Sequence, residues 1–329
     1  MNNNQLININ QNSKQALIKS KKLLDLTNKI ITYNHKWIYQ LLEWADKNDI
    51  PDYIWIEDKD TDKGGYYTGI PRNKQTLLSL KYLRLNDLNI VKLPDEIFNL
   101  IQLEELKIIN CNLESISPQI QKLINLRNLS LNKNQLSKLP GELSNLHNLC
   151  EIHLALNVFI EFPKVLYKMK SLKHICIYSN QITSICNDIS NLSGLEELMI
   201  HENNLINLPL KLFNLKNLIK LTLCNTEINR LSNRIGLLIN LETLLINDTK
   251  IKKLPKEIKN LKKLKLLILE NNELMNNLPN EIIEINISYG LLLRNMPKLV
   301  LTSSQKQWIK NLKNNGTFIA YNDNLLDVI

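Results

Sequence analysis

The chain has 329 residues, 44% of them hydrophobic and 22% charged, so it can bury a sizeable core and is not a disordered polyelectrolyte. Its formal net charge of +9 is spread along the chain, which argues against nucleic acid or an anionic membrane as its partner. The five cysteines fit neither a disulfide-capped nor a zinc-binding spacing, and they indicate a reducing compartment such as the cytoplasm.

The segment before residue 80 is predicted to be a disordered tail, residues 1–12, followed by a cap, residues 13–79. Its first residues, MNNNQLININ, lack the apolar core of a signal peptide, and no apolar run reaches the ~18 residues of a membrane span. Apolar residues at helical spacing then predict two helices up to about Lys47, with a break near Tyr33. The aromatic residues that follow are Tyr53, Trp55, Tyr66 and Tyr67. We expect these helices and aromatics to cover the open hydrophobic edge of the next segment.

A 23-residue unit then repeats nine times over residues 80–285. The copies begin at leucines 80, 103, 126, 149, 172, 195, 218, 241 and 264, and only the ninth contains an extra residue. Positions 4 and 6 of each copy are apolar between polar neighbours, which predicts a short strand with one buried face. One copy cannot bury its own apolar surface, so the fixed period predicts a solenoid of stacked coils with a parallel sheet on one side.

Two further positions indicate how each coil turns. Position 9, just after the strand, is Asn in five copies, and we expect its side chain to bond the backbone of adjoining coils in a buried ladder. Positions 14 and 15 read Leu-Pro, as in Leu139-Pro140, or a relic such as Ile116-Ser117, which predicts the start of a short helix. The strand side is narrower than the helix side, so the sheet should be concave.

The pattern LxxLxLxxNxLxxLPxxIxxLxx, seen for example from Leu126 to Asn148, resembles the leucine-rich repeat in its 23-residue intracellular variety. It is similar to the repeats of Ras-binding scaffold proteins, plant Ras-group proteins and leucine-rich-repeat effectors of bacterial pathogens. The resemblance covers residues 80–285. It implies an α/β horseshoe that binds another protein on its concave sheet, with short helices on the convex side.

Beyond the ninth repeat the pattern decays, and residues 286–329 are predicted to form a C-terminal cap of mixed helix and strand. The expected elements are a strand at Pro297–Leu301, a helix capped by Ser303 or Ser304 that runs to about Leu312 with Trp308 inward, and a strand at Thr317–Tyr321.

Strand positions 3, 5 and 7 and turn position 8 should point away from the core. In repeats one to three these positions are mostly polar, whereas repeats four to nine place aromatic, sulfur-containing and aliphatic residues there, including Leu156, Cys224 and Leu266. Such exposed groups are typical of interface cores. The predicted protein-binding residues are His153, His174, Cys176, Tyr178, Met199, His201, Glu202, Leu245, Asp248 and Ile268. The alternatives are drift on an unused face and shielding by the C-terminal cap.

The sequence predicts no active site, cofactor or metal. It contains no phosphate-binding glycine loop, HExxH, GxSxG or paired CxxC. His153 and His174 should lie on neighbouring strands two residues out of register, with Cα atoms ~8 Å apart, so they cannot converge on zinc. Cys186 and Asp188 resemble the CxD motif of bacterial ubiquitin ligases, but they lie within a repeat and we expect no separate catalytic domain.

These observations predict a monomeric, non-enzymatic module that binds a folded protein in the cytoplasm. One setting is an effector or effector regulator in a host cell, delivered by a route that needs no signal peptide. Another is a scaffold or regulator of a small GTPase or signalling enzyme. An enzyme with its activity in the terminal caps, and a membrane-surface protein that uses the lysines between Lys250 and Lys265, are the remaining alternatives.

Overall fold

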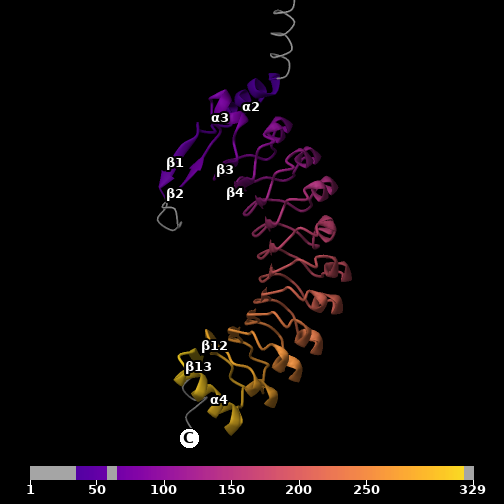
Figure 1. The fold of residues 1–329 in the computed structure, drawn as a ribbon, viewed down its shortest axis with the longest axis vertical. Coiled ribbons are helices and arrows are strands. Elements are labelled where there is room, and N and C mark those ends of the chain that lie inside the picture. The colour runs from indigo at the N-terminus through magenta and orange to yellow at the C-terminus, as the bar shows by residue number, and fades with distance from the viewer. Residues whose placement is uncertain (1–34, 58–64, 322–329) are drawn as a thin grey trace, which may run out of the picture.

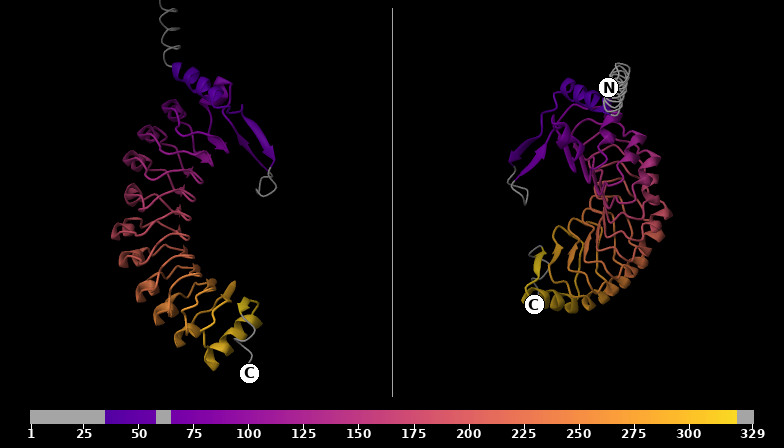
Figure 2. Two further views of the ribbon diagram at one scale, coloured as in Figure 1. Left: turned by 180° about the vertical axis from the view of Figure 1, so that it is seen from behind. Right: turned by 45° about the horizontal axis from the view of Figure 1, so that its top comes forward.

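The computed structural model describes residues 35–57 and 65–321. They form a horseshoe with a sheet along its concave side and short helices along its convex side (Figure 1). The same curvature is seen from behind and from above (Figure 2). The tail expected at residues 1–12 and the first cap helix expected before Tyr33 lie outside the described residues.

The concave sheet has 11 parallel strands in chain order, as the repeat predicts. Residues one repeat apart are paired, so that Leu129 lies opposite Ile152, which lies opposite Ile175. The strands are β3 (Tyr82–Asn86), β4 (Glu105–Ile109), β5 (Asn128–Ser130), β6 (Glu151–His153), β7 (His174–Cys176), β8 (Glu197–Met199), β9 (Lys220–Thr222), β10 (Thr243–Leu245), β11 (Leu266–Ile268), β12 (Gly290–Leu293) and β13 (Phe318–Tyr321).

The apolar positions of the repeat form one continuous core between the sheet and the convex helices. In the third repeat Leu126, Leu129 and Leu131 are completely buried. Full burial of a leucine side chain contributes about 1.5–3 kcal/mol. A single coil has only a few such residues and no second layer, so its stability depends on its neighbours in the stack.

The convex helices are all 3-10 helices of five residues. The expected Leu-Pro start is confirmed, because Pro140 precedes the third helix with extended backbone angles, and Ser117 caps the second by accepting from the Gln119 N–H. A five-residue segment suits the tighter 3-10 winding, which takes less chain per turn than an α-helix. The helices are η1 (Asp95–Asn99), η2 (Pro118–Lys122), η3 (Gly141–Asn145), η4 (Lys164–Lys168), η5 (Asn187–Asn191), η6 (Leu210–Asn214), η7 (Asn233–Leu237), η8 (Lys256–Asn260) and η9 (Asn280–Glu284).

The buried asparagine ladder predicted at position 9 is confirmed. The Asn157 side chain donates to the carbonyl oxygens of Leu131, at 2.9 Å, and Leu154, at 3.1 Å, and its Oδ1 accepts from the Leu136 N–H at 3.0 Å. One side chain therefore satisfies backbone groups of its own coil and of the preceding coil. Asn134, Asn180 and Asn203 repeat the arrangement.

The residue just before the ladder, position 8, has a left-handed backbone conformation in every repeat. This regularity was not predicted from the sequence. Asn and Asp adopt a positive φ most readily after Gly, and they hold more than half of these positions. The row comprises Asp87, Asn110, Lys133, Leu156, Ser179, Glu202, Asn225, Asp248 and Asn271, with Asn295 continuing it in the next coil.

The N-terminal cap covers the first repeat with a helix and extends a hairpin beyond it. Helix α2 (Lys36–Lys47) buries Ile38, Leu41 and Ala45, and the short helix α3 (Lys74–Leu78) leads into β3. Strands β1 (Ile54–Glu57) and β2 (Gly65–Thr68) form a separate antiparallel hairpin, which projects on the concave side of the horseshoe (Figure 1).

The aromatic residues of this hairpin do not cover the edge of the sheet as expected. Trp55 and Tyr67 are 46% and 50% exposed and pack on one another. Tyr66 turns to the repeats, where its ring lies under the Arg84 guanidinium at 3.6 Å, and Tyr53 is partly buried against the hydrophobic core. At the edge of β3 the Arg84 carbonyl instead accepts two hydrogen bonds, one from the Thr68 side-chain hydroxyl and one from the Gly69 backbone N–H.

The C-terminal end differs from the expectation in two places. The strand expected at Pro297–Leu301 is absent from the described chain, where Val300 makes only an isolated bridge, and the sheet continues through β12 instead. Helix α4 (Ser303–Asn314) is capped by Thr302 rather than by Ser303 or Ser304. As predicted, Trp308 points inward and is buried, and its Nε1 donates to the Ile285 carbonyl at 3.0 Å. Across the described residues no helix has the length and apolar character to cross a membrane.

Candidate functional site

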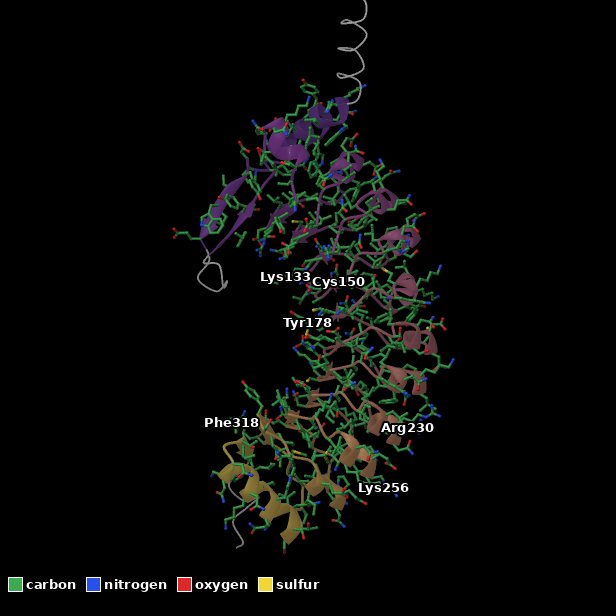
Figure 3. All side chains as sticks on the ribbon, viewed as in Figure 1. Lys133, Cys150, Tyr178, Arg230, Lys256 and Phe318 are labelled. Atoms are coloured by element: carbon green, nitrogen blue, oxygen red, sulfur yellow. The ribbon has the colours of Figure 1, made fainter. Side chains whose placement is uncertain are left out.

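The candidate site is the concave face of the sheet, defined here as the outward side chains of β3–β13 together with the left-handed row at position 8. Tyr178 and Lys133 lie on this face, and Phe318 lies at its C-terminal end (Figure 3). Arg230 and Lys256 lie on the opposite, convex side (Figure 3). The face is built from adjacent parallel strands, so residues 23 positions apart form columns across it.

The position-3 column is polar and pairs its own charges. Glu197 lies 3.6 Å from His174 and 3.9 Å from Lys220, measured between side-chain oxygen and nitrogen atoms. Glu151 accepts from the Asn128 amide at 2.6 Å and lies 3.8 Å from the His153 Nε2. The predicted binding residues His153 and His174 are therefore half-buried and held beside carboxylates, at the border of any apolar contact.

The position-5 column alternates between covered and accessible side chains. Cys176, a predicted binding residue, is only 4% exposed and offers almost no surface to a partner. Ser130 and Thr222, each two strands away in the same column, are equally covered. The predicted residues Met199, Leu245 and Ile268 are longer and remain partly exposed. The outward direction of this column was correctly predicted, but short side chains form its floor.

The Cys176 thiol also has no environment for nucleophilic chemistry. Burial raises its pKa to about 11, so the thiolate is disfavoured. The neighbouring His153 has a pKa lowered by its own burial, which weakens it as a base. Nowhere in the described residues do three His, Cys, Asp or Glu side chains gather in a way that could hold a metal ion.

An aromatic pair lies at the centre of the face. The rings of Tyr178 and His201 stack with centroids 4.4 Å apart and planes 13° from parallel. The His201 Nδ1 lies 2.9 Å from the Thr222 hydroxyl, which fixes the ring orientation. Burial lowers the pKa of His201 and raises that of Tyr178, so both rings stay neutral at pH 7. Neutral, partly exposed stacked rings are suited to contact with another molecule.

The position-8 row borders this pair and contains the two predicted acidic residues. Glu202 is exposed and accepts a short hydrogen bond from the Ser179 hydroxyl, and Asp248 accepts from the Asn247 amide at 2.7 Å. Leu156 is also in this row, and its side chain is 40% exposed. Its backbone N–H donates to the Tyr178 carbonyl at 3.0 Å, which places it beside the aromatic pair. The structure therefore brings the predicted residues Tyr178, His201 and Glu202 together. Leu156, which was not among the predicted binding residues, lies beside them.

Two exposed aromatic residues close the position-3 column at its ends. Tyr82 on β3 is 55% exposed, and Phe318 on β13 is 65% exposed above Gly290, its neighbour across the sheet. Phe318 was missed because its strand has no repeat motif around it. A strand was expected there, but nothing in the sequence indicated that it joins the same sheet.

Comparison with known proteins supports the repeat architecture. A family model described as a leucine-rich repeat region matches residues 72–178. A solved leucine-rich repeat protein of Leptospira interrogans is 33% identical over 74% of this chain and 61% of that chain, with a TM-score of 0.68. The crystal structure of a TDR receptor is 25% identical over 78% of this chain and 41% of that chain, with a TM-score of 0.58.

A more distant structure shares the fold alone. The leucine-rich repeat ectodomain of a plant membrane receptor kinase from Arabidopsis thaliana, solved with Casparian strip integrity factor 2, is 21% identical over 77% of this chain and 39% of that chain, with a TM-score of 0.51. No curated protein matches the chain. The chain thus spans less than two thirds of the length of each of these three solved chains.

Proposed function

The chain belongs to the leucine-rich repeat proteins, and from that premise we propose that it binds a folded protein on its concave face, over repeats four to eight. Leucine-rich repeat domains are typically binding modules rather than enzymes. The observation that carries the proposal is the Tyr178–His201 stack, which stays partly exposed in the middle of the sheet, beside a position-3 column in which Glu197 is paired with His174 and Lys220. Aromatic residues in such positions are enriched at interface cores.

The rigidity of the solenoid supports the same proposal. The buried asparagine ladder and the continuous core fix every strand, so the side chains of the face are held before a partner arrives. Binding then costs little ordering entropy on this side of the interface. Met199, Leu245 and Ile268 extend the apolar part of the contact from the stack toward the C-terminal repeats.

The decisive experiment removes the centre of the face and leaves the fold intact. The double substitution Tyr178→Ala and Met199→Ala is expected to weaken the complex by more than about 2 kcal/mol, measured by isothermal titration calorimetry with a partner identified by affinity purification and mass spectrometry. The matched control is Leu210→Ala with Leu237→Ala, which removes exposed apolar surface from the convex helices η6 and η7. Unchanged affinity in the Tyr178/Met199 variant, with a retained circular dichroism spectrum, would refute the site.

The setting of this interaction forms a second proposal. The repeat pattern resembles that of bacterial leucine-rich-repeat effectors, and on that resemblance we propose an effector or effector regulator, with a scaffold of a small GTPase as the alternative. The five cysteines are free thiols, which suits a reducing cytoplasm, either that of the producing cell or that of a host. The test is a translocation reporter fused to the chain and expressed in a bacterium that delivers effectors into host cells. If the reporter is not delivered, the effector proposal is refuted.

A further inference from the structure

The left-handed row along the edge of the concave face has a direction. Over repeats three to eight the row begins with a basic residue, continues with an apolar one and ends with an acidic one. The residues in order are Lys133, Leu156, Ser179, Glu202, Asn225 and Asp248. Neighbouring members are one strand spacing apart, about 4.8 Å. A ligand group lying along this edge would therefore meet an apolar surface first and a carboxylate at about 10 Å.

Leu156 is the apolar member of the row, in which Lys133, Ser179 and Glu202 also have a positive φ without being Gly, Asn or Asp. Its φ of 57° is a conformation that costs a residue with a Cβ atom roughly 1–2 kcal/mol, and Asn or Asp reduces this cost by local hydrogen bonding. Its side chain is also 40% exposed, so it does not recover that cost by burial. The left-handed conformation is common to the row, so what distinguishes Leu156 is an exposed apolar side chain, which is available for contact with a partner.

Glu202 is the acidic member of the row next to the aromatic pair. On the strands, Glu105 is paired with Lys107 at 2.9 Å and Glu197 with Lys220, whereas Asp248, in the same row as Glu202, accepts from the Asn247 amide. Within the part of the chain that the structure describes, Glu202 makes no ion pair, and its carboxylate is held only by the Ser179 hydroxyl. An oriented carboxylate without a counter-ion is complementary to a cation from outside.

The aromatic pair joins these two residues into one surface. Leu156 donates its N–H to the Tyr178 carbonyl, the Tyr178 ring stacks on His201, and Glu202 directly follows His201 in the chain. An aliphatic group, two parallel rings and a carboxylate therefore follow one another across three adjacent repeats. A flat cation on an aliphatic stem matches this series better than any neutral side chain.

We propose that the partner inserts an arginine side chain here, with its stem on Leu156, its guanidinium over the Tyr178–His201 pair and its charge on Glu202. The inference rests on the proposed function and names the chemistry that the concave face recognises. Lys133, at the opposite end of the row, repels the guanidinium and sets its direction toward Glu202. Arginine is preferred to lysine because its planar fork both stacks on rings and pairs with a carboxylate through two hydrogen bonds.

The test uses the full chain and two defined peptides, acetyl-Gly-Gly-Arg-Gly-Gly-amide and the same peptide with citrulline, which keeps the shape and loses the charge. Binding is followed by NMR through the methyl groups of Leu156 and the ring protons of His201. The arginine peptide is expected to give saturable shifts at both residues, with the citrulline peptide at least about fivefold weaker. Equal binding of the two peptides, or no shift with the arginine peptide at its solubility limit, overturns the proposal.

Two substitutions separate recognition from folding. Glu202→Gln is expected to weaken the arginine peptide about fivefold, while the convex control Asp188→Asn leaves it unchanged. Leu156→Asn places a residue suited to the left-handed conformation, so it should raise the thermal midpoint and at the same time weaken the peptide. A higher midpoint with unchanged peptide affinity, or a Glu202→Gln variant that binds normally, also overturns the proposal.

The identified partner distinguishes failure of this inference from failure of the proposed function. A complex weakened by Tyr178→Ala with Met199→Ala but not by Glu202→Gln retains the concave site and refutes the arginine. A complex indifferent to the Tyr178/Met199 variant refutes the site itself.

Discussion

The asparagine ladder supports a quantitative prediction about stability, with Asn180→Ala as the perturbation. Asn180 lies in the fifth repeat and is almost completely buried. Its Nδ2 donates to the carbonyl oxygens of Leu154 at 3.0 Å, Tyr178 at 3.1 Å and Ile177 at 3.2 Å, and its Oδ1 accepts from the Phe159 N–H at 3.0 Å. Alanine removes all four contacts and is too short to replace any of them.

The expected loss follows from the backbone groups left without partners. The amide has two N–H groups, so two carbonyl interactions are lost in effect, together with the bond from the buried Phe159 N–H. Each buried group left unsatisfied costs about 1–3 kcal/mol, and water can reach the less buried Tyr178 carbonyl. We therefore expect Asn180→Ala to lower the free energy of unfolding by about 3 kcal/mol.

Urea unfolding followed by far-UV circular dichroism measures this loss. The matched control is Asn204→Ala, at an exposed position one place after the ladder residue of the next repeat, which should stay within about 0.5 kcal/mol of the unchanged protein. Asn180→Thr should fall between the two, because Thr226 holds the Leu223 carbonyl from the same position with its hydroxyl at 2.7 Å. An Asn180→Ala variant within about 1 kcal/mol of the unchanged protein would show that the ladder does not stabilise the stack.

Three further outcomes are expected. Burial lowers the pKa of His201, so as pH falls through about 6.5 the unfolded chain takes up a proton that the folded chain does not. The free energy of unfolding should therefore decrease between that pH and the lower pKa of the folded state, and then level off. The substitution His201→Gln should flatten this part of a plot of thermal midpoint against pH. Thr302→Ala should destabilise helix α4 by about 1 kcal/mol in urea unfolding, whereas Ser303→Ala should change little, because only the former residue accepts from the helix backbone. Arg84→Gln removes the guanidinium that lies over the Tyr66 ring, so it should speed amide hydrogen exchange in the β1–β2 hairpin. Unchanged exchange would mean that the hydrogen bonds from Thr68 and Gly69 to the Arg84 carbonyl are enough to hold the hairpin against β3.

The repeat region was predictable because each of its features is local and recurs. Alternating leucines such as Leu129 and Leu131 give the strand its direction, and the asparagine at position 9 has one geometry that satisfies the backbone beside it. Nine copies repeat this information, so accidental substitutions in one copy do not hide it. The left-handed row escaped prediction for the opposite reason: Lys133 and Leu156 occupy it beside asparagines, and their residue types do not indicate a positive φ.

The caps were less predictable because they have no period. Strand β12 starts 24 rather than 23 residues after β11, and Gly290 stands there opposite Leu266. The sheet therefore continues through β12, although the 23-residue spacing of the sequence motif is lost there. At the other end, the aromatic residues of the hairpin were expected to be buried, but a two-stranded hairpin has no second layer to bury them. Trp55 and Tyr67 pack on each other instead, while Tyr53 stacks on Tyr67 with ring centroids 4.8 Å apart and also packs against the core.

The candidate site shows the limit of reasoning from strand alternation. Alternation correctly predicts that Cys176 and Met199 both point away from the core, since they are direct neighbours in one column. It does not predict how deep each lies, because depth depends on the length of the surrounding side chains and on the inward curve of the sheet. Cys176 is short and becomes covered, while Tyr178, two residues later, is long enough to rise above its neighbours and stack on His201. At the proposed site a partner would therefore meet the long residues of the face over a floor of short ones, and its recognition would depend on the side chains that reach beyond that floor.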